Sequence, residues 1–250
     1  RRSCSAFFYN IFIMNHKLEV CLSPALLHLY DTTDCNVVII DIFRATSTIT
    51  TALHNGAAAV IPVASVEECI TIGNQTANSI TAGERDGKVA PGLAYGNSPF
   101  EYPADFINGK TLVLTTTNGT KLLHMVQGAA NIIIGSFLNL DAVVDFLKND
   151  NKPVVLGCAA WKDRFNLEDT LFAGAVASAL QQDFTINCDS ARAAIHLHDA
   201  SNGAYLAFLK NSSHYNRLSG YGLLKDLEYC TSTNLHPIVP ILQGDKLLAL

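Results

Sequence analysis

The chain has 250 residues, which is enough for one large α/β domain or two small lobes with a sizeable core. Its formal net charge is −5 and it carries no basic stripe, which argues against a nucleic acid partner. No apolar run reaches the ~20 residues that a membrane-spanning helix needs, so we expect no membrane partner. Seven cysteines without a C-x-x-C pair favour reduced thiols and a cytoplasmic protein over a disulfide framework.

The N-terminal residues 1–13 are treated as an extension whose place in the native protein is an open question. They have a basic start and two apolar stretches, but neither a starting Met nor the A-x-A cleavage site of a signal peptide. Met14 is the expected natural start. Because no linker, repeat or low-complexity tract follows, residues 14–250 are expected to form a single α/β domain.

Apolar runs alternate with segments of helical spacing along the rest of the chain. The continuous run at 36–40 predicts a strand buried on both faces, and a helix follows from Ala45 to a stop at Asn55-Gly56. Residues 83–98 read as a long polar loop. Further strands are predicted at 17–22, 58–62, 79–82, 111–114, 131–135 and 153–157, and a closing hairpin at 238–242 and 247–250. Further helices are predicted at 65–74, after 98, from 120 to 127, at 139–148, at 167–180, and with breaks over 189–229.

This alternation predicts the fold class. It implies an α/β protein with a mainly parallel β-sheet flanked by helices on both faces, a three-layer α/β/α arrangement with room for a second, smaller lobe. The carboxyl ends of parallel strands meet at one edge of such a sheet, where ligands bind.

Four polar clusters each come directly after a predicted strand, so we expect all four at that edge. They are Asp41 with Arg44, then Gly83-Glu84-Arg85, then residues 115–120, and finally the stretch from Cys158 to Asp169. Arginines bind phosphate or sulfonate oxygens in bidentate fashion, and the Asn118-Gly119 turn can present backbone N–H groups to an anion. Carboxylates are the hard oxygen ligands of Mg²⁺. The pattern predicts a site for a small dianion with a divalent metal.

Each cluster also has a structural interpretation. Asp41 and Arg44 could form an ion pair at a strand end, and Glu84-Arg85 could be a surface salt bridge. Asn118-Gly119 could be an ordinary turn. The adjacent acids Glu168 and Asp169 fall in the first turn of a helix, where acids are favourable anyway. Cys158 is more often a small core residue than a nucleophile. The convergence of four clusters favours a site over four coincidences.

Several segments resemble the 2-phosphosulfolactate phosphatase family. The elements Asp-x-x-Arg-Ala-Thr and Thr-Thr-Asn-Gly-Thr are specific when they occur together. The matching segments are residues 38–48, Gly83-Glu84-Arg85, Gly96-Asn97-Ser98-Pro99, residues 115–120, Gly135-Ser136-Phe137-Leu138-Asn139 and Leu167-Glu168-Asp169-Thr170. The resemblance implies a Mg²⁺-dependent phosphatase that hydrolyses 2-phospho-3-sulfolactate to 3-sulfolactate and phosphate, a step in coenzyme M synthesis.

Residue roles are assigned on this resemblance. The expected catalytic residues are Asp41, Glu84 and Asp169, and the expected metal ligands are Asp41, Glu168 and Asp169. Six residues are expected to grip phosphate and sulfonate: Arg44, Arg85, Asn97, Thr117, Asn118 and Gly119. We expect direct attack by water, with a phospho-aspartyl intermediate at Asp41 as the less favoured route.

The chain departs from the family at two places. Ala160 stands where the family typically has Gly, and the stretch 92–95 lacks an acid that the family carries there. The reaction class is therefore a firmer expectation than the exact substrate. Two alternatives stay open: a phosphatase for another small 2-phospho acid, and a non-catalytic binding protein for a phosphorylated or sulfonated acid. A homodimer is expected because closed symmetric dimers are common.

Overall fold

Ten strands of the described residues form one mixed sheet at the centre of the fold, in the order β1-β8-β2-β7-β9-β10-β3-β6-β4-β5. The computed structural model describes residues 16–85, 87–126 and 128–250, so the expectations for residues 1–13 and Met14 lie outside it. The strands are β1 (Leu18–Cys21), β2 (Asn36–Ile40), β3 (Ala59–Val63), β4 (Ser79–Arg85), β5 (Lys88–Val89), β6 (Thr111–Thr115), β7 (Asn131–Gly135), β8 (Val154–Cys158), β9 (Pro240–Gln243) and β10 (Lys246–Ala249).

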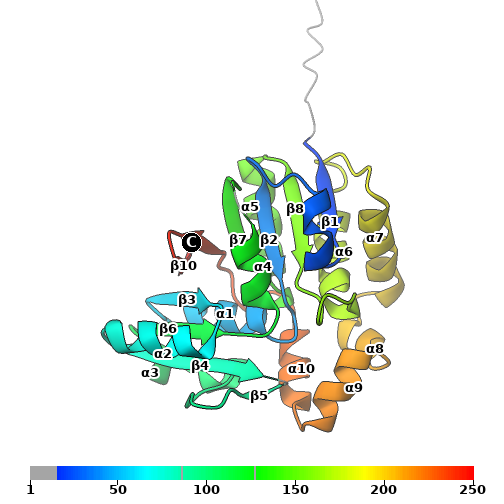
Figure 1. Ribbon diagram of the computed structural model, residues 1–250. Helices are drawn as coiled ribbons and strands as arrows, with labels where there is room; N and C mark the ends of the chain where they lie inside the picture. Colours follow the sequence, from blue (N-terminus) through cyan, green and yellow to red (C-terminus); the bar gives the residue numbers. More distant parts are fainter. Residues whose placement is uncertain (1–15, 86, 127) are drawn as a thin grey trace, which may run out of the picture.

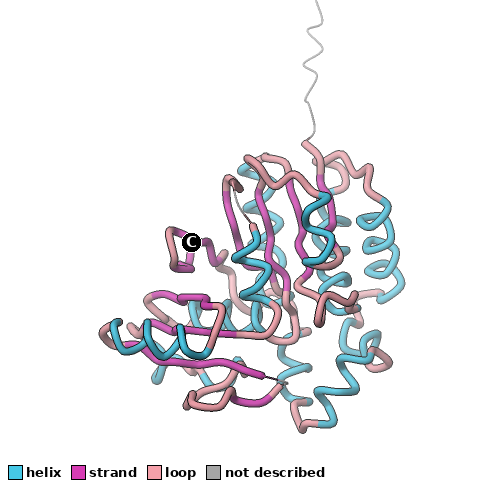
Figure 2. Tube along the Cα trace, in the orientation of Figure 1, coloured by secondary structure: helices cyan, strands magenta, loops and turns pink. Residues whose placement is uncertain are grey.

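The sheet consists of two mainly parallel halves joined by a hairpin. The first half is β1, β8, β2 and β7, in which β2 pairs in parallel with both β7 and β8. The second half is β3, β6, β4 and β5, in which β6 pairs in parallel with both β3 and β4. The hairpin β9–β10 lies between them and pairs antiparallel with β7 and β3. Figure 1 shows the two halves running in different directions, and Figure 2 shows the helices around them.

The helices are bounded by clear local signals. Ser65 caps α2 by accepting a hydrogen bond from the Glu68 backbone, and Ser98 caps the 3₁₀ helix η2 in a capping box with Glu101. The helices are η1 (Pro24–Leu29), α1 (Ala45–His54), α2 (Val66–Gln75), η2 (Pro99–Glu101), α3 (Ala104–Ile107), α4 (Gly119–Met125), η3 (Phe137–Asn139), α5 (Leu140–Asp150), α6 (Leu167–Leu180), α7 (Asp189–Ser201), α8 (Tyr205–Leu209), α9 (Ser213–Gly220) and α10 (Leu224–Cys230).

The core lies on both faces of β2, as its continuous apolar run predicts. Val38 and Ile40 pack into one buried cluster with residues of α5 and α6, while Val37 and Ile39 pack into another with residues of α1 and α4. Fully burying one such side chain stabilises the fold by about 1.5–3 kcal/mol. The end of β2 is therefore rigidly held, which fixes the residues that follow it.

The chain crosses between the halves twice. The helix α1 leads from β2 in the first half to β3 in the second, and α4 leads back from β6 to β7. In Figure 1 the arrows of β2 and β8 point down toward the region where β4 ends beside α10. The carboxyl ends of strands from both halves therefore face a common region.

The predicted fold class is confirmed, with one local correction. The segment 83–98 is not a loop throughout, because β4 runs on to Arg85 and then pairs antiparallel with β5. Gly83 permits this extension: a Cβ there would lie 2.6 Å from the Thr115 carbonyl oxygen of the neighbouring strand. No helix of the described residues is long and apolar enough to cross a membrane.

Candidate active site

A small cleft, partly open to solvent, lies where the two halves of the sheet meet the C-terminal helices. Its lining includes six of the residues that the sequence predicts: Asp41, Arg44, Glu84, Asn97, Thr117 and Asn118. The remaining lining residues are Phe43, Gly87, Trp161, His214, Arg217 and Leu218. Asp41 and Arg44 follow β2 of the first half, whereas Glu84 and Thr117 belong to the second, so the predicted convergence of strand ends is present.

Asp41 is held at the junction of β2 and α1. Its backbone N–H donates to the Thr46 hydroxyl (3.1 Å), and its carbonyl accepts from the Thr46 backbone N–H (3.0 Å). Its side chain lines the cleft but is almost wholly withdrawn from solvent, at 7 % exposure. Burial raises the pKa of Asp41 to about 7; the charges of Glu84 and Glu168 add to the rise, and His214 opposes it. A cation at this position would favour the ionised carboxylate.

Arg44 is not the partner of Asp41 in a structural ion pair. Its Nη1 lies 2.5 Å from Oδ2 of Asp226 on α10, and both side chains are buried. Its Nη2 donates to the carbonyl oxygen of Gly87 (3.3 Å). The sequence carries no signal for Asp226, since an acid in a short helix 182 positions away is unremarkable by itself. The ion pair fixes the guanidinium at the edge of the cleft.

Glu84 ties two loops of the second half together. Its Oε1 accepts from the Thr117 backbone (3.0 Å) and its Oε2 accepts from the Gly87 backbone (2.8 Å). Arg85 is not part of the cleft lining. Its guanidinium donates to the Glu84 carbonyl oxygen (2.7 Å) and the Thr115 hydroxyl (3.1 Å). The structure thus brings Glu84 into the cleft and leaves Arg85 beside it.

Two cleft residues carry buried polar atoms that have no hydrogen-bond partner among the described residues. These atoms are Oδ1 of Asn97 and Oγ1 of Thr117. An unsatisfied buried polar atom costs about 1–3 kcal/mol, so such atoms are usually bound by a ligand or water. Gly119 lies directly against Asp41, because a Cβ on Gly119 would lie 2.8 Å from Oδ2 of Asp41. Its lack of a side chain lets α4 begin against Asp41.

Glu168 is not part of the cleft lining, but it contacts a histidine that is. Its side chain is fully buried, and its Oε1 lies 2.5 Å from Nδ1 of His214, which lines the cleft. Its second oxygen, Oε2, is buried with no hydrogen-bond partner in the described part of the chain. His214 lies on α9, where no sequence motif marked it as functional.

Asp169 has a different setting from its neighbour. Its Oδ1 accepts from the Ile42 backbone (2.9 Å), and its Oδ2 accepts from the Ala160 backbone (3.0 Å) and the Asn166 amide (2.9 Å). Burial, with the charges of Glu168 and Asp41, raises its pKa well above the usual range. Both oxygens are engaged and the residue is absent from the cleft lining. Asp169 therefore joins the start of α6 to the loops that follow β2 and β8.

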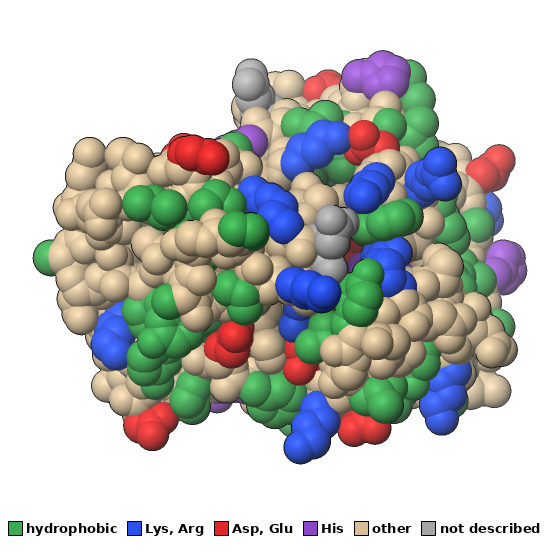
Figure 3. All heavy atoms as spheres, turned by 60° about the horizontal axis from the view of Figure 1, so that its bottom comes forward, with side chains coloured by type: hydrophobic (Ala, Val, Ile, Leu, Met, Phe, Trp, Pro, Cys, Tyr) green, Lys and Arg blue, Asp and Glu red, His purple; other side chains and the backbone are tan. Residues whose placement is uncertain are grey.

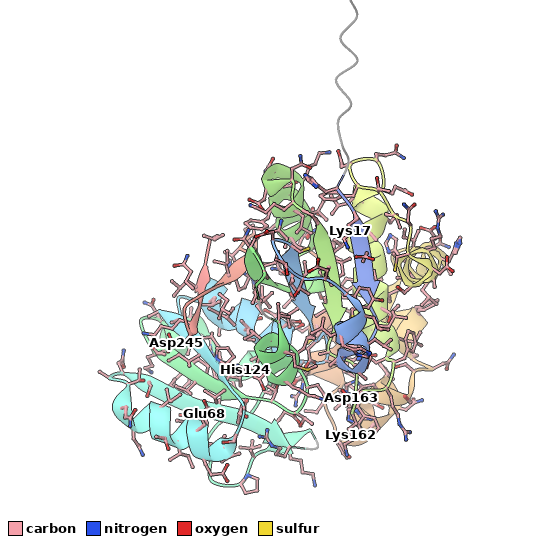
Figure 4. All side chains as sticks on the ribbon, turned by 45° about the horizontal axis from the view of Figure 1, so that its top comes forward. Lys17, Glu68, His124, Lys162, Asp163 and Asp245 are labelled. Carbon is pink, nitrogen blue, oxygen red and sulfur yellow. The ribbon has the colours of Figure 1, made fainter. Side chains whose placement is uncertain are left out.

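The loop after β8 holds an alanine in a backbone conformation that favours glycine. Ala160 adopts a positive φ of 59°, a left-handed conformation that costs an ordinary residue about 1–2 kcal/mol and a glycine almost nothing. Cys158, at the end of β8, is fully buried within the core. Lys162 and Asp163 follow in the same loop (Figure 4), and Asp163 pairs with Lys121 of α4 at 2.8 Å.

A positive rim surrounds this part of the molecule. Figure 3 brings the bottom of Figure 1 forward and shows Lys and Arg side chains gathered around the middle of that face. The chain as a whole is acidic, with a formal net charge of −5, so this gathering of Lys and Arg side chains is a local feature of that face. Such a local field attracts anions and raises their rate of encounter with the cleft.

The donor set fits a hard divalent cation. Mg²⁺ usually takes one or two protein carboxylates, with waters and substrate oxygens completing its shell. The buried Asp41 carboxylate and the unpartnered Oε2 of Glu168 match that pattern. No group of three or more His, Cys, Asp or Glu side chains with metal-binding geometry occurs in residues 16–85, 87–126 and 128–250. An all-protein cage, as in a structural zinc site, is therefore absent from that part of the chain.

Comparisons with known proteins agree with this geometry. The sequence profile of the family described as 2-phosphosulpholactate phosphatase matches residues 21–245. A "Probable 2-phosphosulfolactate phosphatase" of Thermotoga petrophila is 44% identical over 205 residues, which cover 82% of this chain and 88% of that protein. Proteins of the same description from Caldanaerobacter subterraneus and Carboxydothermus hydrogenoformans are 38% and 37% identical, over 86% and 90% of this chain and 90% and 92% of their own length.

Proposed function

Because the chain belongs to the 2-phosphosulfolactate phosphatase family, we propose that it hydrolyses 2-phospho-3-sulfolactate to 3-sulfolactate and inorganic phosphate. The observation that carries the proposal is the cleft itself. There, a buried acid with a raised pKa, Asp41, lies with the fixed guanidinium of Arg44 and the unpartnered polar atoms of Asn97 and Thr117. A phosphate dianion offers acceptors and charge that match the Arg44 guanidinium and the Thr117 hydroxyl.

We further propose that the enzyme depends on Mg²⁺, with Asp41 and Glu168 as the residues that hold the ion. When bound, the metal would polarise the phosphoryl group and offset its negative charge. His214 holds Glu168 through its Nδ1, so the free Oε2 keeps its position. Asp169, which sequence reasoning assigns to the metal and to catalysis, is better suited to positioning Glu168, since its own oxygens already accept three hydrogen bonds.

The remaining groups bind the phosphoryl oxygens. The Thr117 hydroxyl and the N–H groups of Arg44 that Asp226 does not occupy can donate to oxygens on which negative charge builds up. Preorganised donors of this kind are commonly worth about 3–4 kcal/mol each in the transition state. Asn97 and Asn118 add amide groups to the lining of the cleft.

The bond changes are those of a simple hydrolysis. A water oxygen forms a bond to phosphorus, and the bond between phosphorus and the C2 oxygen breaks. The departing C2 oxygen takes up a proton, and the water loses one. Asp41 or Glu84 orients the attacking water, and both lie in the cleft lining. A step in coenzyme M synthesis, a cytoplasmic location and a homodimer stay predictions of this account.

The proposal is tested by phosphate release from purified protein. Wild-type protein is given 2-phospho-3-sulfolactate, 2-phospholactate or p-nitrophenyl phosphate, with Mg²⁺ or with excess EDTA. We expect phosphate release in Mg²⁺, its loss in EDTA, and the highest kcat/KM for 2-phospho-3-sulfolactate. A higher kcat/KM for another 2-phospho acid would change the substrate and keep the reaction class. Tight binding of the substrate without phosphate release would instead support a binding protein.

A further inference from the structure

One cationic side chain of the cleft has no role in the hydrolysis described above. Arg217 lies on α9 and lines the cleft, and its guanidinium carbon lies 3.9 Å from the centroid of the Trp161 ring. We propose that Arg217, stacked on Trp161, binds the sulfonate at the non-reacting end of the substrate and so determines substrate specificity. This inference rests on the proposed function and extends it to residues that the sequence did not point to.

Trp161 is anchored through its backbone, and its ring lies under Lys162 Nζ (4.9 Å to the centroid) as well as under Arg217. It lies in the loop after β8, where its backbone N–H donates to the Arg164 carbonyl (2.9 Å) and its carbonyl accepts from the Arg164 N–H (3.0 Å). Stacking on an aromatic ring restricts a guanidinium to one plane and leaves the N–H groups at its edge free to donate. The pair is therefore preorganised at little further cost in side-chain entropy.

Two arginines of the cleft lining, Arg44 and Arg217, and Arg85 beside it differ in how their N–H groups are used. Arg44 is committed to Asp226 and to the Gly87 carbonyl. Arg85 is committed to the Glu84 carbonyl and the Thr115 hydroxyl. The Arg217 side chain makes no hydrogen bond or ion pair with any residue that the structure describes, and its cation–π contact is with the ring of Trp161. Its donors are thus available to a ligand.

The substrate supplies an acceptor that matches these donors. A sulfonate is fully ionised at neutral pH and has three oxygens, two of which can accept hydrogen bonds from one edge of a planar guanidinium. The phosphoryl end is already provided for by Arg44, Thr117 and Asp41. The neighbouring Leu218 and Phe43 in the cleft lining give an apolar wall for the short carbon chain between the two anionic groups.

The test compares two substrates that differ only in the sulfonate. Wild-type and Arg217→Gln proteins are assayed in Mg²⁺ with 2-phospho-3-sulfolactate and with 2-phospholactate. We expect Arg217→Gln to lower kcat/KM for the sulfonated substrate about 10- to 100-fold, chiefly by raising KM, since a hydrogen bond to a charged group is worth about 1.5–3 kcal/mol. The kcat/KM for 2-phospholactate is expected to change less than about threefold. Arg217→Lys keeps the charge without the planar edge of the guanidinium. Its kcat/KM for the sulfonated substrate is expected to lie between those of wild type and Arg217→Gln.

The matched control is Arg192→Gln, which removes an exposed arginine from α7, outside the cleft lining. It is expected to keep the wild-type kcat/KM for both substrates. Equal losses for both substrates in Arg217→Gln would place Arg217 at the phosphate or the carboxylate, which both substrates carry, and overturn the inference, as would no loss for either.

A binding measurement separates this inference from the proposed function. Calorimetric titration with 3-sulfolactate and with lactate needs no turnover. We expect Arg217→Gln to weaken the binding of 3-sulfolactate about 10-fold or more and to leave that of lactate unchanged. If wild-type protein releases no phosphate but shows this difference, the proposed function fails and the sulfonate site stands. An unchanged Kd for 3-sulfolactate in the variant would refute the sulfonate site even in an active phosphatase.

Discussion

The guanidinium of Arg44 lies 2.5 Å from the carboxylate of Asp226, and both side chains are withdrawn from solvent. The pair joins the turn after β2 to α10 across 182 positions of sequence. Because Arg44 lines the cleft, the ion pair fixes the orientation of its guanidinium toward a bound ligand. Its energetic effect is asymmetric, because removing one partner leaves the other charge buried and unpaired.

The variant Asp226→Asn is expected to lower the free energy of unfolding by about 3–5 kcal/mol, measured by urea denaturation. The control Glu228→Gln removes an exposed acid of the same helix and is expected to have little effect. The double variant Arg44→Met with Asp226→Leu is expected to recover most of the loss, since no unpaired charge remains. A stability of Asp226→Asn equal to that of Glu228→Gln would contradict the buried ion pair.

Asp169→Asn is expected to cost more stability than any exposed acid. The amide presents an NH₂ group where a carboxylate oxygen accepts from backbone N–H groups, so at least one buried donor faces another donor. We expect a loss of about 2–4 kcal/mol in urea denaturation. Asp189→Asn, an exposed acid in the first turn of α7, is the control and is expected to lose no more than about 1 kcal/mol. Equal losses would show that the three hydrogen bonds to Asp169 are not formed.

Gly119→Ala is expected to impair activity rather than folding. The added Cβ would lie 2.8 Å from Oδ2 of Asp41 and 3.0 Å from the Cβ of Ala45, so the Asp41 carboxylate has to move. Because small displacements of reacting groups cost large factors in rate, we expect kcat to fall at least about 10-fold. Gly220→Ala, where an added Cβ meets nothing within 4 Å, is expected to keep wild-type kcat. Unchanged kcat in Gly119→Ala would mean that Asp41 is not fixed as described.

His236 is expected to make stability depend on pH. Burial, reinforced by the stacked His54, lowers the pKa of His236 from 6.5 to about 4. Between these values the unfolded chain binds a proton that the folded chain does not, so stability falls as the pH falls through this window. His236→Gln is expected to show a shallower fall in unfolding free energy from pH ~7 to pH ~4.5 than wild type. The exposed His196→Gln is the control, and identical slopes for all three proteins would refute the prediction.

The parts of the fold that sequence predicts well are those fixed by local pattern. The apolar run 36–40 predicts a strand, and the hydroxyl-rich segment after it predicts the start of a helix. The structure has β2 at Asn36–Ile40 and α1 from Ala45. The same rule places Asp41, Glu84 and Thr117 at one edge, because each follows or ends a strand. The hairpin β9–β10 is predicted as a hairpin, but its insertion between the two halves depends on long-range pairing that no local pattern encodes.

The functional residues that sequence reasoning did not identify lie in a different part of the chain. Asp226, His214 and Arg217 come from α9 and α10, whose positions relative to the sheet are set by tertiary packing alone. Glu168 and Asp169 are adjacent acids in one helix turn, so sequence cannot tell which of them keeps an unpartnered oxygen. The difference lies in their neighbours: three N–H donors surround Asp169, and one histidine meets Glu168.

The most direct test of the account is the rate at which Asp41→Asn releases phosphate from 2-phospho-3-sulfolactate in Mg²⁺, beside wild-type protein and with folding checked by circular dichroism. We predict rapid release by wild type and a loss of kcat/KM of at least about 10³-fold in the folded variant, which corresponds to about 4 kcal/mol. A folded Asp41→Asn protein that releases phosphate at close to the wild-type rate would contradict the account.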